Sequence, residues 1–316
     1  MLIPNLLLFC IALALLIISG SWLVKSGIKI ANFLRLPEFL LGFVLIAVAT
    51  SLPEWFVGIA AALSKEPELS LGTVLGSNIA NICLIFGVGL LLAKRIRFTT
   101  KEAKTDSIVM LITAILPLAL MMLGRQLSRI DGVVLLFVFF AYYTYVIRQR
   151  KRYHKRSHEQ VSRAAAILSS FIFIASMVML FFSARWTVKS GTVLATELQL
   201  PPLLIGLFFV AIGTSLPELV VTIHAMLRHE TDIGIGNIIG SNITNVALVL
   251  GTTALLAPIP IDSLVFVSSA LYVIVVSLVF TAFLESGRLT WLSGLSLIML
   301  YIFFLFLEVV IKAIPI

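Results

Sequence analysis

The sequence contains two short motifs, and each of them occurs twice at the same spacing. Thr-Ser-Leu-Pro-Glu stands at 50–54 and again at 214–218, while Gly-Ser-Asn-Ile-x-Asn stands at 76–81 and again at 240–245. One offset of 164 residues relates both pairs. A chain with two motif pairs in one register is an internal duplication, so its fold has to accommodate each motif twice.

The duplication extends well beyond the motifs. Aligned without a gap, residues 22–87 and 186–251 share 30 identical residues in 66 positions. The segment between the two copies is hydrophilic and strongly basic. We therefore predict a first five-helix repeat over 1–147, a basic cytoplasmic linker over 148–163 and a second repeat over 164–316.

The composition is that of a membrane protein. Hydrophobic residues make up 60% of the chain, charged residues 12%, and the mean hydropathy is +1.12. Apolar stretches of about 20 residues can cross a bilayer core of about 30 Å as helices. The sequence predicts an all-α polytopic membrane protein with ten such transmembrane helices, of which helices 2, 3, 7 and 8 are broken at the motifs. The predicted spans are 3–32, 38–64, 69–93, 105–123, 128–148, 164–194, 202–228, 233–257, 262–284 and 289–313.

Five spans in each repeat have a topological consequence. A unit with an odd number of spans ends on the opposite side of the membrane from its start, so its copy inserts upside down. Inverted repeats of this kind are common in secondary transporters, whose substrate site lies near the midplane at the repeat interface. We therefore expect the two Thr-Ser-Leu-Pro-Glu segments to face each other across a pseudo-two-fold axis.

The charge distribution predicts the orientation. If the chain changes sides after every span, one side carries fifteen lysines and arginines and the other carries four. By the positive-inside rule the fifteen are cytoplasmic, and both termini lie outside the cell membrane. This topology accounts for the net charge of +8 without nucleic acid as a partner. The expected partners are membrane lipid and inorganic cations, with no obligatory protein partner evident, and the first span looks retained rather than cleaved.

Each Thr-Ser-Leu-Pro-Glu segment places a helix break and an acid inside an apolar stretch. Pro53 has no amide hydrogen and its ring clashes with the carbonyl four residues earlier, so the helix breaks just before it. Carbonyls near Ala47, the hydroxyls of Thr50 and Ser51, and the Glu54 carboxylate then supply only oxygen ligands. The second copy repeats the set as Ala211, Thr214, Ser215, Pro217 and Glu218. A plain proline bend is the alternative, and the paired glutamates argue against it.

Two carboxylates inside a bilayer need compensation. Each costs about 2.5–3.5 kcal/mol to place at the centre of a membrane helix. Hard cations such as calcium take about six to eight oxygens, commonly a mixture of carboxylates and carbonyls. One divalent or two monovalent cations would neutralise Glu54 and Glu218, and a proton competes for the same carboxylates. The pattern therefore predicts a cation site and an ion pathway.

The second motif adds amides and hydroxyls. Each copy places a serine and an asparagine four residues apart, on one helical face: Ser77 with Asn81, and Ser241 with Asn245. We interpret these four as ion ligands, and Asn78 and Asn242 as residues that brace helix contacts or a loop. Small polar residues also occur at membrane helix contacts, so close packing is the alternative.

With these residues the chain resembles the calcium/cation antiporter superfamily, close to its prokaryotic sodium/calcium exchanger branch. The similarity covers nearly the whole length, through ten predicted spans, two inverted halves and both paired motifs. The resemblance implies alternating access around one central cluster of cation sites, with the long first and sixth spans sliding against the rest. It implies metal coordination by Ala47, Thr50, Ser51, Glu54, Ser77, Asn81, Ala211, Thr214, Ser215, Glu218, Ser241 and Asn245, the two alanines through their backbone carbonyls.

One position departs from the family pattern. Many calcium-exchanging relatives carry an aspartate where this chain has Asn245, so the site here is less negative and more symmetric. We predict sodium/calcium antiport with Ca²⁺ and Na⁺ as transported ions and no cofactor. Proton- or potassium-coupled exchange of calcium or another cation stays open, as does a passive cation channel. An enzyme is disfavoured, because no nucleophile–base pair or nucleotide loop is evident, and the two cysteines form no disulfide framework.

Overall fold

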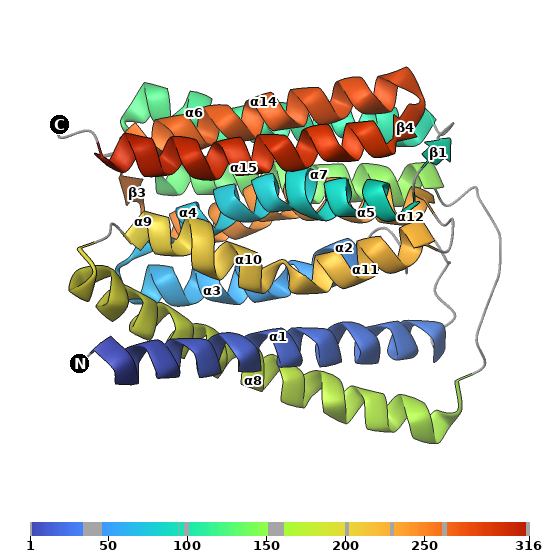
Figure 1. The fold of residues 1–316 in the computed structure, drawn as a ribbon. Helices are drawn as coiled ribbons and strands as arrows, with labels where there is room; N and C mark the ends of the chain where they lie inside the picture. The colour runs from blue at the N-terminus through green and yellow to red at the C-terminus, as the bar shows by residue number, and fades with distance from the viewer. Residues whose placement is uncertain are drawn as a thin grey trace.

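The computed structural model describes residues 2–33, 46–93, 95–97, 101–150, 161–199, 202–227, 231–260 and 264–313, and these are nearly all helical (Figure 1). The helical elements of the first half are α1 (Leu2–Phe33), α2 (Ile46–Thr50), α3 (Leu52–Leu63), α4 (Pro67–Ile79), the π-helix η2 (Ala80–Ile85), α5 (Phe86–Ala93), α6 (Lys101–Gly124) and α7 (Arg129–Arg150). Those of the second half are α8 (Arg163–Glu197), α9 (Pro202–Ile205), η3 (Gly206–Val210), α10 (Ala211–Thr214), α11 (Leu216–Leu227), α12 (Thr231–Thr244), η4 (Asn245–Leu250), α13 (Gly251–Leu256), α14 (Leu264–Ser286) and α15 (Trp291–Ala313).

The helices are long and apolar enough for a polytopic membrane protein. Within the described residues, eight are able to cross a membrane by length and composition, and a ninth is added if the bent pair Gly206–Thr214 and Leu216–Leu227 is one span. The sequence predicts ten. The remaining predicted span, 38–64, begins outside the described residues, and its later part forms α2 and α3.

The outer surface of the bundle is apolar where lipid would surround it. Large hydrophobic side chains on the outer helices are exposed, among them Phe137 and Phe140 on α7 and Phe171 and Ile174 on α8. Contiguous exposed apolar surface of this kind marks a membrane-facing protein. Polar side chains are instead buried in the interior, which reverses the usual arrangement of a water-soluble domain.

Two long helices form a layer of their own. α1 and α8 pack against each other and cross along one side of the bundle, while α6, α14 and α15 lie on the opposite side (Figure 1). Between these layers run α2 to α5 and α9 to α13, which carry both motif pairs. The stretches from α4 to α5 and from α12 to α13 are the most deeply buried of the candidate spans.

The predicted helix break before each motif proline is confirmed. α2 ends at Thr50 and α3 begins at Leu52, with Ser51 between them at φ −82° and ψ 2°. In the second copy Ser215 takes nearly the same conformation, at φ −82° and ψ 6°, and the two flanking helical segments meet at 47°. The missing proline amide hydrogen explains why both breaks fall at the serine of the motif.

The prediction that the third and eighth spans are broken is wrong, because both spans continue as helices. α4 passes through η2 into α5, and α12 passes through η4 into α13. Asn81 lies in the first of these π-helical turns and Asn245 begins the second. Neither motif copy contains a proline that would remove a backbone hydrogen bond, so the helix continues through each motif instead of ending. Single π-helical turns of this kind occur often at functional sites.

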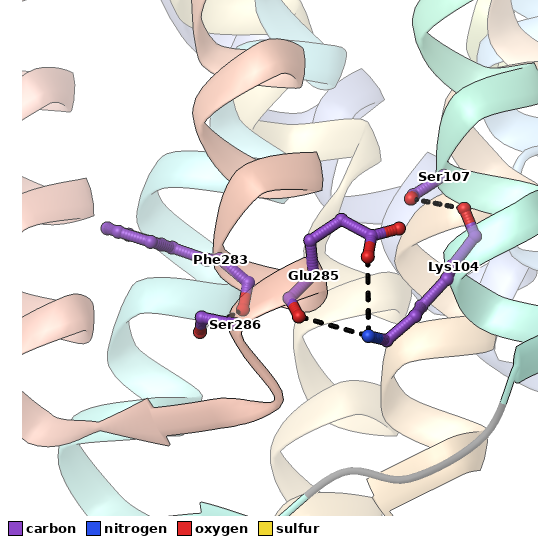
Figure 2. Close-up of polar contacts among 5 residues, drawn as sticks. All are labelled: Lys104, Ser107, Phe283, Glu285 and Ser286. Carbon is purple, nitrogen blue, oxygen red and sulfur yellow. Dashed lines mark hydrogen bonds and ion pairs between the residues drawn. The ribbon is translucent and has the colours of Figure 1, made fainter.

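Short strands join the two halves at their loops. β1 (Arg95–Arg97) pairs antiparallel with β4 (Arg288–Thr290), and β2 (Gln126–Leu127) pairs antiparallel with β3 (Ile259–Pro260). Beside them, Lys104 of α6 donates to the backbone carbonyl of Glu285 at 3.0 Å and to its Oε2 at 3.3 Å (Figure 2). This partly exposed ion pair contributes at most about 1 kcal/mol to the stability of the fold.

Glycines permit the closest contacts between the halves. A Cβ atom added to Gly76 of α4 would collide with the backbone carbonyl of Leu207 in η3. A Cβ atom added to Gly206 would collide with the backbone carbonyl of Leu69. These contacts bring the backbones of α4 and η3 together beside the second motif, and backbone atoms cannot move away as a flexible side chain can.

The first prediction concerns this contact. Gly76→Ala should lower the free energy of unfolding by about 1–3 kcal/mol, the range for overpacking a well-packed core. The measurement is the unfolding temperature of the purified protein in detergent. Gly124→Ala is the matched control, because nothing lies within 4 Å of an added Cβ there. Equal unfolding temperatures for the two variants would contradict the packing account.

Candidate functional site

Two glutamates lie at the centre of the structure, each on the first turn of a helix that follows a break. Glu54 is on the first turn of α3 and Glu218 is on the first turn of α11, and neither has any exposed surface. The amino end of a helix carries a partial positive charge, which favours a carboxylate at this position. The breaks therefore place both acids deep in the protein with partial electrostatic compensation.

Hydroxyl groups from both halves surround the two carboxylates. Glu54 Oε1 accepts hydrogen bonds from Ser77 Oγ and Ser215 Oγ, both at 3.3 Å. Glu218 Oε1 accepts from Ser51 Oγ at 3.5 Å. Each glutamate thus contacts the serine that precedes the motif proline of the other half. The acids of the two copies share one polar centre.

Backbone carbonyls at the breaks belong to the same centre. The carbonyl oxygens of Ala47 and Ala211 each accept from the threonine three residues later and from a serine of the opposite half. The donors are Thr50 at 3.3 Å and Ser241 at 3.4 Å for Ala47, and Thr214 at 3.3 Å and Ser77 at 3.4 Å for Ala211. This correspondence follows the 164-residue offset of the sequence.

Four asparagines form a reciprocal cluster beside the glutamates. Asn81 Nδ2 donates to Asn242 Oδ1 at 2.9 Å, and Asn245 Nδ2 donates to Asn78 Oδ1 at 3.1 Å. The side chains of Asn78 and Asn242 each donate to the other's backbone carbonyl at 3.4 Å. These bonds support the interpretation of Asn78 and Asn242 as bracing residues. They also orient the amides of Asn81 and Asn245.

Four buried oxygen atoms in this centre have no hydrogen-bond partner. They are Glu54 Oε2, Glu218 Oε2, Asn81 Oδ1 and Asn245 Oδ1. Buried acceptors are almost always satisfied in native proteins, since an unmade bond costs about 1–3 kcal/mol or more for a charged group. The four belong to corresponding residues of the two repeats. A cation coordinated by these oxygens would remove this cost.

The lengths of the hydrogen bonds distinguish Glu54 and Glu218 from another buried acid. The hydroxyl-to-carboxylate bonds at Glu54 and Glu218 measure 3.3–3.5 Å. At Glu308, a buried acid on α15 away from this centre, Ser268 and Ser269 donate at 2.9 and 2.7 Å. Bonds to carboxylates are normally shorter than neutral ones. The hydroxyls at the centre therefore hold Glu54 and Glu218 less tightly than the serines hold Glu308.

The donor set selects a class of ligand. Its atoms are carboxylate, hydroxyl, amide and backbone carbonyl oxygens, which suit hard cations such as calcium and sodium. Across the part of the chain that the structure describes, no group of three or more His, Cys, Asp or Glu side chains comes together. Among the described residues, the ligands identified at the centre are therefore oxygens, two of them carboxylates, which is typical of a calcium site rather than a zinc site.

Hydrogen bonds connect ten of the twelve predicted ligands around the two carboxylates. Asn81 and Asn245 lie four residues after Ser77 and Ser241 and bond to the other two asparagines. The roles of all the predicted ligands in ion binding stay a prediction. The sequence did not single out Asn237, whose side chain contacts Thr50, nor Glu308. Two signals were present: position 237 breaks the internal repeat, where its counterpart is Thr73, and Glu308 is an acid in an apolar stretch.

A helical bundle with an apolar exterior and a buried polar centre shared by two related halves defines a polytopic membrane protein. The family model for the sodium/calcium exchanger protein matches residues 4–148 and 168–310. The chain belongs to this family.

Individual relatives match along almost the whole chain. Inner membrane protein YrbG of Escherichia coli K12 is 31% identical over 284 residues, covering 86% of each protein. Sodium/calcium exchanger MaX1 of Methanosarcina acetivorans is 29% identical, covering 96% of this chain and 98% of the relative. A solved structure of the sodium-calcium exchanger NCX_Mj superposes with a TM-score of 0.67 at 27% identity, covering 96% of this chain and 98% of that one.

The second prediction tests the asparagine cluster. Asn242→Ala removes the acceptor of Asn81 and leaves its buried amide unpaired, so the free energy of unfolding should fall by about 1–3 kcal/mol. Thermal unfolding in detergent measures the change. An unfolding temperature equal to that of the wild type for Asn242→Ala would refute the bracing role.

Proposed function

We propose that the protein is a secondary antiporter that exchanges sodium for calcium by alternating access around the buried centre at Glu54 and Glu218. The observation that carries the proposal is the set of four buried, unpartnered oxygens at this centre, contributed equally by the two repeats. The family membership and the named exchangers among the relatives support the choice of sodium and calcium. Calcium and sodium are transported substrates here, and the proposal includes no cofactor.

The proposed ligands include the four unpartnered atoms and the oxygens that surround them. They are the backbone carbonyls of Ala47 and Ala211 and the side chains of Thr50, Ser51, Glu54, Ser77, Asn81, Thr214, Ser215, Glu218, Ser241 and Asn245. Calcium would draw on both carboxylates, because bridging them removes the repulsion between like charges. Sodium would draw more heavily on the neutral carbonyl and hydroxyl oxygens.

Charge balance suggests the stoichiometry. Glu54 and Glu218 together carry two negative charges when ionised, and position 245 holds a neutral amide. One calcium ion or two sodium ions neutralise the pair, whereas three sodium ions would leave a net charge in a low-dielectric interior, where it is costly. We therefore expect two monovalent cations to exchange for each calcium ion, without net charge transfer.

The proposed architecture is the ten-helix inverted repeat predicted from the sequence, with α1 and α8 as the elements that move. Support comes from the hydroxyls on these two helices. Ser19 and Ser26 on α1, and Ser183 and Ser190 on α8, each donate to a carbonyl three or four residues earlier in the same helix. Because these hydroxyls are satisfied internally, they do not tie the two helices to the core, and sliding breaks none of these bonds.

A contact at the centre of α1 offers a route from ion binding to movement. A Cβ atom at Gly20 would lie 3.0 Å from Cγ of Pro53 and 3.7 Å from Cγ of Pro217. The same point of α1 therefore touches both motif prolines. A change in the angle of either break on ion binding would press directly on α1.

We also propose the orientation predicted from charge, with the basic linker 148–163 in the cytoplasm and both termini outside the cell membrane. The linker lies largely outside the described residues. Lipid and inorganic cations are the proposed partners. Proton- or potassium-coupled exchange is the second candidate, favoured by the neutral amides of Asn81 and Asn245 in place of a third carboxylate.

The third prediction concerns the two acids. Glu54→Gln or Glu218→Gln should reduce sodium-driven calcium uptake into proteoliposomes to background, because one charge is too few to neutralise a dehydrated calcium ion. Glu285→Gln is the control, since its side chain is 51% exposed and forms an ion pair with Lys104. Normal coupled flux in a folded Glu54→Gln or Glu218→Gln protein would exclude the assigned centre.

The fourth prediction separates the candidate functions. Calcium uptake is measured while sodium, potassium and pH gradients are imposed in turn, with the membrane potential clamped at two values. Sodium/calcium antiport predicts uptake driven by the sodium gradient alone, and the charge balance predicts equal rates at both potentials. Uptake that follows the pH or potassium gradient would favour the second candidate. Uptake without any counter-gradient would identify a channel.

A further inference from the structure

Asn237 of α12 connects the two halves at the centre but has no equivalent in the first repeat. Its side chain has no exposed surface. Oδ1 accepts a hydrogen bond from Thr50 Oγ1 at 3.4 Å, across the interface between the halves. Nδ2 donates to the backbone carbonyl of Glu218 at 3.4 Å and to Thr222 Oγ1 at 3.1 Å. One amide thus links a proposed ligand of one half to the acid-bearing turn of the other.

The internal repeat shows that this link exists on one side only. The counterpart of Asn237 is Thr73, whose hydroxyl donates to the Leu69 carbonyl of its own helix at 2.8 Å. The counterpart of Thr222 is Gly58, which has no side chain to accept a bond. The two halves therefore carry similar predicted ligands at the motifs, but the side chains that hydrogen-bond to those ligands differ.

The difference falls on the two motif threonines. Thr214 Oγ1 lies 3.0 Å from the Val210 carbonyl, so its single hydrogen has a good acceptor within its own helix. Thr50 Oγ1 is 3.3 Å from the Ala47 carbonyl and 3.4 Å from Asn237 Oδ1. Ser241 Oγ lies 3.3 Å from the same Thr50 oxygen and 3.4 Å from the Ala47 carbonyl. When the Thr50 hydrogen points to Asn237, the Thr50 oxygen keeps at least one lone pair for a cation, because the single Ser241 hydrogen can occupy only one. The Ala47 carbonyl then no longer accepts from Thr50.

We propose that Asn237 is a positioning residue that acts through Thr50. It takes the Thr50 hydroxyl hydrogen, and so creates a monovalent-cation position beside Thr50 and Ala47 that is stronger than the corresponding position beside Thr214 and Ala211. This inference rests on the proposed function. The position is assigned to sodium because its ligands are neutral oxygens, whereas calcium draws its binding energy chiefly from the two carboxylates.

The test measures cation binding independently of transport. Cations that bind the folded protein raise its unfolding temperature, so the half-maximal concentrations of sodium and of calcium can be read from purified protein in detergent. Asn237→Ala should raise the half-maximal sodium concentration about fivefold to tenfold, the effect of one neutral hydrogen bond. The half-maximal calcium concentration should change less than about threefold. A purely structural role would shift both ions alike and overturn the proposal.

Two further variants show whether the effect passes through Thr50. Thr50→Val removes the hydroxyl, and in that background Asn237→Ala should have almost no additional effect on sodium, because residues in one interaction are not additive. Independent, additive effects would contradict the proposal. Asn237→Thr introduces the threonine that the first repeat carries at the corresponding position, Thr73. This variant should weaken sodium binding as Asn237→Ala does. It keeps the test decisive if the alanine variant fails to fold.

Thr73→Val is the matched control, since the Thr73 hydroxyl donates to the Leu69 carbonyl of its own helix. It should leave the sodium dependence unchanged. The outcomes also separate this inference from the proposed function. Wild-type protein that binds sodium but does not exchange it would defeat the function alone, and wild-type sodium dependence in both Asn237 variants would defeat the inference alone.

Discussion

The structure depends on one electrostatic constraint: two carboxylates are held in an interior with no access to bulk water. Their insertion costs about 5–7 kcal/mol together. The serines that donate to the two carboxylates from both halves and the helix amino ends that follow the two breaks reduce this cost. They reduce it incompletely, since one oxygen of each carboxylate has no partner. A centre that is compensated in part is suited to an ion that binds and then leaves.

The packing of the bundle serves this centre. Gly76 and Gly206 let the helix backbones meet beside it, and the asparagine cluster holds the second motifs of the two halves together. The layer formed by α1 and α8 is bonded within itself and touches the centre at Gly20. A core bonded across the two halves and a layer that packs on it through apolar side chains are two mechanical parts suited to alternating access.

Much of this arrangement was predictable from the sequence, because a repeated motif restricts both position and chemistry. The break before Pro53 follows from a missing amide hydrogen, and the pairing of Glu54 with Glu218 follows from the duplication. The continuous π-helical turns at Asn81 and Asn245 were not predictable, since a widened helix and a broken one look alike in sequence. Asn237 escaped notice because its role depends on contact with Thr50, which is 187 positions away.

The central claim is that Glu54 and Glu218 bind one divalent cation between them. Its most direct test is an anomalous difference map from crystals soaked in strontium, a divalent ion with strong scattering. The account predicts a single strong peak within bonding distance of both carboxylates, with Asn81 or Asn245 beside it. A peak elsewhere in the bundle, or carboxylates turned apart toward lipid, would contradict it.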